Sequence, residues 1–172
     1  RVRLQLGSLY VAQGRAEEAI AQLEDIPDTE DLPLLQAARV GLGDAWMASA
    51  DTDTAMLWYQ EAMRTAPESE LGLLAAYRLG RAKFAAGAAG EAQALFDLVV
   101  TRAPWPPKTV SGPGDVLRPA EQLALEARLA LALAELADGR VDEARVHAEW
   151  VRNQAAGSLH AIRADYYLAW MA

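Results

Sequence analysis

The chain has 172 residues, of which 52% are hydrophobic and 23% charged, so it is long and apolar enough to fold around a core without disulfides or metals. Its net charge of -8 argues against binding to nucleic acid or anionic membranes, because both require clustered Lys and Arg. The absence of cysteine excludes disulfides, thiolate metal sites and thiol catalysis.

The compartment is open between bacterial cytoplasm and the periplasm or cell envelope. No uninterrupted apolar stretch reaches the roughly 20 residues of a membrane span, and no signal-peptide pattern is present, so no membrane insertion is expected within this sequence. Alanine richness and a preference for Arg over Lys indicate a GC-rich, bacterial gene. Arg1 at the start, and an apolar helical pattern that runs to Ala172, lead us to expect a fragment of a larger polypeptide.

Apolar residues recur at three- and four-residue spacing along the chain, which predicts helices and no strands. Asp53, Ser69, Pro119 and Ser158 are the expected helix starts among these segments. The Pro- and Gly-rich segment 105–118 is predicted to be a long loop. In chain order, the predicted helices cover about 1–13, 16–26, 32–49, 53–66, 69–86, 90–102, 119–138, 141–155 and 159–171.

An internal repeat organises these helices into pairs. A leucine followed by a small residue recurs as Leu6-Gly7, Leu42-Gly43, Leu79-Gly80 and Leu131-Ala132. Eight residues after each leucine stand Gly14, Ala50, Gly87 and Gly139, where a first helix should end and the chain reverse. Thirteen residues after it stand Ala19, Ala55, Ala92 and Ala144, and seventeen after it Leu23, Tyr59, Phe96 and Ala148. The predicted units are about 1–30, 31–67, 68–104, 119–156 and a partial 158–172, within one domain covering 1–172.

This pattern resembles the tetratricopeptide (TPR) repeat. The second unit matches the family's motif most fully, with Leu42, Gly43, Trp46, Ala55, Tyr59, Ala62 and Pro67. The third unit departs from it at Lys83, and the fourth keeps only Leu131, Gly139 and Ala144. The resemblance implies an all-α, right-handed α-solenoid of about four antiparallel helical hairpins plus one extra helix. Unit lengths near 36 residues are similar to those of bacterial cell-envelope lipoproteins and assembly factors.

In this family the first helices of the hairpins line a concave groove, which implies a non-enzymatic scaffold that binds a helix or extended peptide of a protein partner. The alternative function is a peptide-sensing module that regulates an effector domain elsewhere. Another possibility is that neighbouring repeats, the Trp105 loop or a closing superhelix cover these apolar residues in the intact protein. The expected lining stands two before, two after and five after each leucine, and its principal members are Val40, Asp44, Met47, Tyr77, Arg81, Phe84, Leu133, Tyr166 and Trp170.

Enzyme and cofactor sites have little support in the sequence. His147 and His160 are the only histidines, and His147 with Glu143 one turn away supplies two metal ligands where a site needs more. Gly112-Pro113-Gly114 lacks the Lys and Ser or Thr of a phosphate-binding loop. No catalytic residue, cofactor or metal is therefore predicted.

Overall fold

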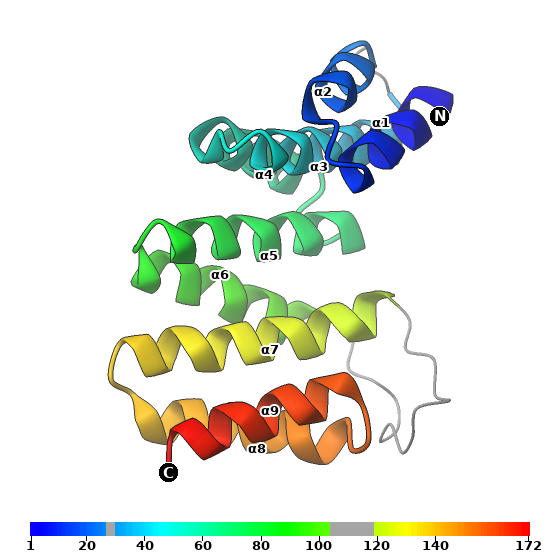
Figure 1. The fold of residues 1–172 in the computed structure, drawn as a ribbon. Helices are drawn as coiled ribbons and strands as arrows, with labels where there is room; N and C mark the ends of the chain where they lie inside the picture. The colour runs from blue at the N-terminus through cyan, green and yellow to red at the C-terminus, as the bar shows by residue number, and fades with distance from the viewer. Residues whose placement is uncertain (27–29, 104–118) are drawn as a thin grey trace. The chain divides into compact units, whose positions relative to one another are not determined.

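The computed structural model describes residues 1–26, 30–103 and 119–172, and throughout these ranges the ordered elements are α-helices (Figure 1). Each helix agrees with its predicted range to within two residues at either end, which confirms the all-α prediction. The predicted loop 105–118 lies outside the described residues. The helices are α1 (Val2–Ala12), α2 (Ala16–Glu24), α3 (Leu32–Ala48), α4 (Thr52–Thr65), α5 (Glu70–Ala85), α6 (Ala89–Arg102), α7 (Pro119–Ala137), α8 (Val141–Gln154) and α9 (Leu159–Trp170).

The first helix of each unit ends where the repeat predicts. The backbone takes a positive φ at Gly14 (72°), Ala50 (65°), Gly87 (82°) and Gly139 (79°), the residues eight positions after the four leucines. Glycine adopts this left-handed conformation without steric cost, and alanine at position 50 does so with some strain. The predicted reversals are thus confirmed in all four units.

Most of the predicted helix starts are also confirmed. The Ser158 hydroxyl accepts a hydrogen bond from the Ala161 amide, and the Ser69 hydroxyl accepts one from the Gly72 amide. The expected start at Asp53 is wrong by one or two residues: α4 begins at Thr52, and the Asp51 carboxylate caps it by accepting from the Thr54 amide. Two acidic residues stand close together here, and only the backbone conformation at the turn decides which one becomes the cap.

The described chain forms two compact units, Arg1–Ala82 and Lys83–Ala172. Within the compact unit Arg1–Ala82, α1 packs on α2 and α3 packs on α4, each pair forming a hairpin. The glycine of each first helix faces the bulky residue of its second helix: a Cβ on Gly7 would lie 2.5 Å from Leu23 Cγ, and one on Gly43 would lie 2.4 Å from the Tyr59 ring. These glycines let each helix pair approach closely, as the repeat spacing predicts.

Within the compact unit Lys83–Ala172, α7 packs against α8 and α9, and α6 packs against α7. Figure 1 shows α7, α8 and α9 side by side. One core cluster joins Leu125 and Leu129 of α7 to Val151 and Ala155 at the end of α8 and to Ala164 of α9. None of the helices in the described ranges combines the length and apolarity that a membrane span requires.

Candidate partner-binding surface

A polar triad of Asp44, Tyr59 and Arg78 lies in the compact unit Arg1–Ala82, on helices α3, α4 and α5. The Tyr59 hydroxyl and the Arg78 Nη1 both donate to Asp44 Oδ1, each at 2.7 Å. Burial raises the pKa of Asp44, and Arg78, the Tyr59 hydroxyl and Arg81 oppose that rise. Burial, then the neighbouring Asp44 carboxylate, raises the pKa of Tyr59, so its hydroxyl stays protonated and donates. Three side chains from α3, α4 and α5 are thereby held in one arrangement.

Two accessible side chains flank this triad. The Arg81 guanidinium is exposed and lies 5.9 Å from the centroid of the Tyr77 ring, within the range of a cation–π contact. Met47 is exposed on α3, three residues after Asp44 and therefore on the same side of that helix. The surface of this unit thus combines an exposed cation, an apolar side chain and a prearranged ion pair.

The predicted groove residues fall into two groups. Val40 and Tyr77, which stand two positions before the repeat leucines of α3 and α5, are buried. Val40 packs against Ala62 of α4 and Ala75 of α5. The predicted residues that stand two or five positions after a repeat leucine are accessible to solvent to differing extents. Met47 and Arg81 are exposed, Asp44 is partly buried, Phe84 and Leu133 are half-buried, and Trp170 is exposed. Tyr166 of α9 is the exception among the residues before the leucine, because it is exposed.

Sequence reasoning missed Arg78 and the role of Tyr59. The signal that could have found Arg78 is its charge, opposite to that of Asp44, at a separation of 34 residues. That separation is about one repeat, which places two residues on successive first helices. Tyr59 was assigned only to packing, because a spacing pattern does not show where a hydroxyl group points.

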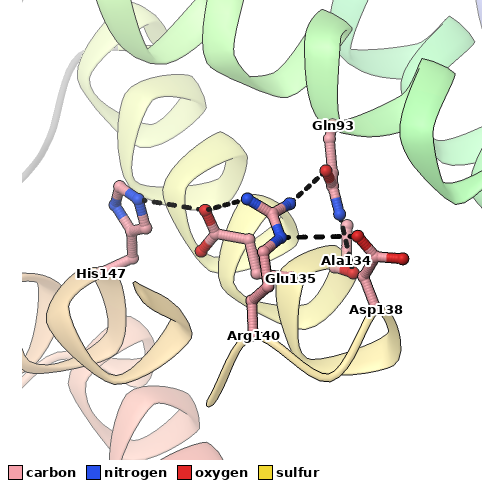
Figure 2. Close-up of polar contacts among 6 residues, drawn as sticks. All are labelled: Gln93, Ala134, Glu135, Asp138, Arg140 and His147. Atoms are coloured by element: carbon pink, nitrogen blue, oxygen red, sulfur yellow. Dashed lines mark hydrogen bonds and ion pairs between the residues drawn. The ribbon is translucent and has the colours of Figure 1, made fainter. Parts of the chain in front are cut away.

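A second polar cluster lies in unit Lys83–Ala172 and centres on the buried Glu135 of α7 (Figure 2). Its Oε1 is 3.6 Å from His147 Nε2 and 3.9 Å from Arg140 Nη1. Arg140 also donates to the Gln93 side-chain oxygen and pairs with Asp138 at 3.4 Å. Gln93 in turn donates to the Ala134 carbonyl at 3.1 Å. These contacts tie α6, the end of α7 and α8 together.

The cluster borders a pocket of about 360 Å³ lined by Gly90, Gln93, Ala94, Asp97, Leu131, Glu135, Arg140 and His147. Burial raises the pKa of Glu135, Glu143 and Asp97 add to the rise, and Arg140 opposes it. Burial also lowers the pKa of His147; Arg128 adds to this, and Asp97 opposes it. Across residues 1–26, 30–103 and 119–172, no three His, Cys, Asp or Glu side chains are grouped as metal binding would require. The contacts of the cluster run between α6, α7 and α8, so it acts as a polar tie between these helices.

The lowered pKa of His147 predicts a pH-dependent stability. Below its ordinary pKa of 6.5, His147 takes a proton more readily in the unfolded chain, so stability falls as pH drops through and below that value. The raised pKa of Glu135 acts in the opposite direction. We expect His147→Gln to lose less stability than the wild type between about pH 7 and pH 5, measured by urea unfolding followed by circular dichroism.

His160 offers a second test of the same physics. Burial lowers the pKa of His160, Arg163 adds to this, and Glu126 opposes it. His160→Gln should therefore also reduce the loss of unfolding free energy between about pH 7 and pH 5. The double variant should have the flattest profile. A His147→Gln chain that keeps the full wild-type dependence would contradict this account.

Comparison with known proteins connects this geometry to solved structures. No family model matches the chain, and neither does any curated protein. A crystal structure described as kinesin light chain TPR-like repeats from Podosopora anserina matches with a TM-score of 0.77 and 22% identity, covering 99% of this chain and 84% of that one.

Two further solved structures align over almost the whole chain. MamA matches with a TM-score of 0.64 and 19% identity, over 97% of this chain and 78% of that one. A thermophilic TPR protein of Thermus thermophilus matches with a TM-score of 0.58 and 18% identity, over 97% of both chains. At these identities the likeness establishes the fold alone. The fold is an α-solenoid of tetratricopeptide-like hairpins, as the repeat predicted.

Proposed function

We propose that this chain is a non-enzymatic protein interaction scaffold that binds a peptide segment of its partner. The peptide binds across the first-helix surface of unit Arg1–Ala82, defined by Asp44, Met47, Arg78 and Arg81. A place in a bacterial cell-envelope assembly stays a prediction from unit length and composition. The observation that carries the proposal is the arrangement of the Asp44–Arg78 ion pair next to an exposed guanidinium and an exposed thioether.

Prearranged side chains favour binding because little conformational entropy is lost when the partner arrives. Asp44 is held by Tyr59 and Arg78 from two other helices, so its position does not depend on the partner. The Tyr77 ring under the Arg81 guanidinium restricts that long side chain. Met47 adapts its shape to different apolar groups because its side chain is unbranched.

The charges of this surface indicate the chemistry of the peptide. Arg78 and Arg81 face one carboxylate, so the three ionised side chains carry a net positive charge, in a chain whose overall charge is -8. An acidic side chain on the peptide would find its favourable partner at Arg81. An apolar residue next to it would cover Met47. The proposal is therefore a peptide with an acidic and an apolar residue close together.

The test selects binders from a random-peptide phage library on the intact chain and measures their affinities by calorimetry. We expect enrichment of acidic–apolar peptides, with binding weakened about tenfold or more by Arg81→Glu and by Met47→Asp. Arg64→Glu is the matched control, because Arg64 is an exposed arginine of the same unit but lies on the second helix α4.

The control separates contact from overall charge. Arg64→Glu changes the net charge as much as Arg81→Glu does, so a long-range charge effect would weaken binding in both. Equal losses in the two variants, or full affinity in Arg81→Glu, would remove this surface from the proposal. Circular dichroism of each variant checks that the helices are intact.

A further inference from the structure

Helix α9 occupies the place of a first helix in the repeat. Leu168-Ala169 follows Leu131-Ala132 by 37 residues, the interval that also separates Leu79 from Leu42. The Ser158 cap at the start of α9 stands ten residues before Leu168, and the Ser69 cap of α5 stands ten before Leu79. Within its unit α9 packs on α8 and α7.

Three positions of the repeat are buried in α3, α5 and α7 and exposed in α9. They lie six before, two before and one after the repeat leucine. In α3, α5 and α7 the residues at the first two positions are at most 6% exposed, and the residue at the third position is also buried. By position, they are Gln36, Leu73 and Leu125 at the first, Val40, Tyr77 and Leu129 at the second, and Gly43, Gly80 and Ala132 at the third. In α9 they are Ile162, 63% exposed, Tyr166, 70% exposed, and the exposed Ala169.

In the hairpins α3–α4 and α7–α8, the second helix packs on these positions. In the second repeat, the Gln36 amide donates to the carbonyls of Ala62 and Ala66 at the end of α4. Val40 packs on Ala62 as well, and Gly43 lies against the Tyr59 ring.

The fourth repeat shows the same arrangement. There Leu125 and Leu129 pack with Val151 and Ala155 of the α8 segment, and Ala132 clusters with Ala148. Among the described residues, no second helix lies on α9 in this way.

We propose that the face of α9 formed by Ile162, Tyr166 and Ala169 docks an amphipathic helix of the second-helix type. Such a helix carries a small residue, a bulky or small apolar residue four positions later, and an apolar residue three further on. In the second to fourth units these three positions are all buried: Ala55, Tyr59, Ala62; Ala92, Phe96, Val99; and Ala144, Ala148, Val151. The docked helix continues on α9 the interface that the hairpins α3–α4 and α7–α8 make internally.

The chemistry of the face fits this occupant. Ala169 presents a small side chain where Gly43 receives the Tyr59 ring, so it leaves room for one bulky residue of the incoming helix. Ile162 and Tyr166 supply apolar area on the same side of α9, at spacings of four and three residues along the stripe to Ala169. This site is separate from the surface around Arg81, and its occupant is a helix rather than an acidic peptide.

The probe is a fluorescein-labelled peptide with the α6 sequence Ala89–Arg102, titrated with the intact chain and followed by anisotropy. We expect saturable binding that weakens about tenfold or more when Ile162→Glu and Tyr166→Glu are combined. The same peptide with Phe96→Glu should fail to bind. The Arg81→Glu chain should bind the peptide as the wild type does, which separates this inference from the proposed function.

The matched control combines Leu57→Glu with Val146→Glu. These residues are 61% and 64% exposed and stand fifteen after the repeat leucine, a position exposed in all four units. The control adds the same charge to equally apolar exposed sites. Equal weakening in both double variants, or no peptide binding by the wild type, would overturn the inference. A dimer in sedimentation equilibrium that the Ile162/Tyr166 variant dissociates would overturn it too, by assigning the face to a second copy.

Discussion

Gly43→Ala is expected to destabilise the protein by about 1–3 kcal/mol or more, although alanine is the better helix former. The added Cβ would lie 2.4 Å from the Tyr59 ring, well inside van der Waals contact. The ring cannot move away easily, because Tyr59 is buried and its hydroxyl is held by Asp44. Urea unfolding monitored by circular dichroism measures the loss as a lower midpoint.

Gly90→Ala is the control for this experiment. Gly90 lies in the first turn of α6, and a Cβ there would meet nothing within 4 Å. The substitution should therefore stabilise the protein slightly, by at most roughly 0.5–1 kcal/mol, through the helix preference of alanine alone. If both glycine variants shifted the midpoint in the same direction, the close approach of α3 and α4 would not be the cause.

Leu129→Ala is expected to cost about 2–5 kcal/mol, because it removes a fully buried side chain and leaves a cavity. Leu129 is 0% exposed and packs with Leu125, Val151, Ala155 and Ala164, so three helices lose contacts at once. The side chain of Trp150 packs against the same cluster, so its fluorescence should change in the unfolding transition of this unit.

Leu57→Ala is the matched control, since it deletes the same atoms from an exposed position of α4. Its effect should stay within about 0.5 kcal/mol. A small loss for Leu129→Ala, comparable to that of Leu57→Ala, would mean that the α7, α8 and α9 cluster does not hold this unit together.

The helices and their reversals could be predicted because both depend on local chemistry. A positive φ favours glycine at one position per unit, and Gly14, Gly87 and Gly139 occur there at repeat spacing. Gly43 and Tyr59 were likewise recognisable as a repeated small and bulky pair. Repetition turns one local pattern into four independent observations of the same pattern, so the TPR-like fold was predictable.

The candidate surface was only partly predictable. A spacing pattern places Val40, Asp44 and Met47 on neighbouring parts of α3, but it does not say which part the second helix covers. Val40 lies under α4 and α5, whereas Met47 is exposed. Figure 2 shows a similar case: His147 lies near Glu135 of another helix, although Glu143 was its neighbour by sequence.

The sequence by itself determined the helices, their turns and the repeated contact between first and second helices, because each depends on residues close together along one hairpin. Only the tertiary structure decided that Asp44 pairs with Arg78 and that Glu135 joins Arg140 to His147. It also decided that Tyr166 is exposed where Tyr77 is buried. The physical reason is that burial and ion pairing depend on the direction of side chains across neighbouring helices, which spacing along one helix does not specify.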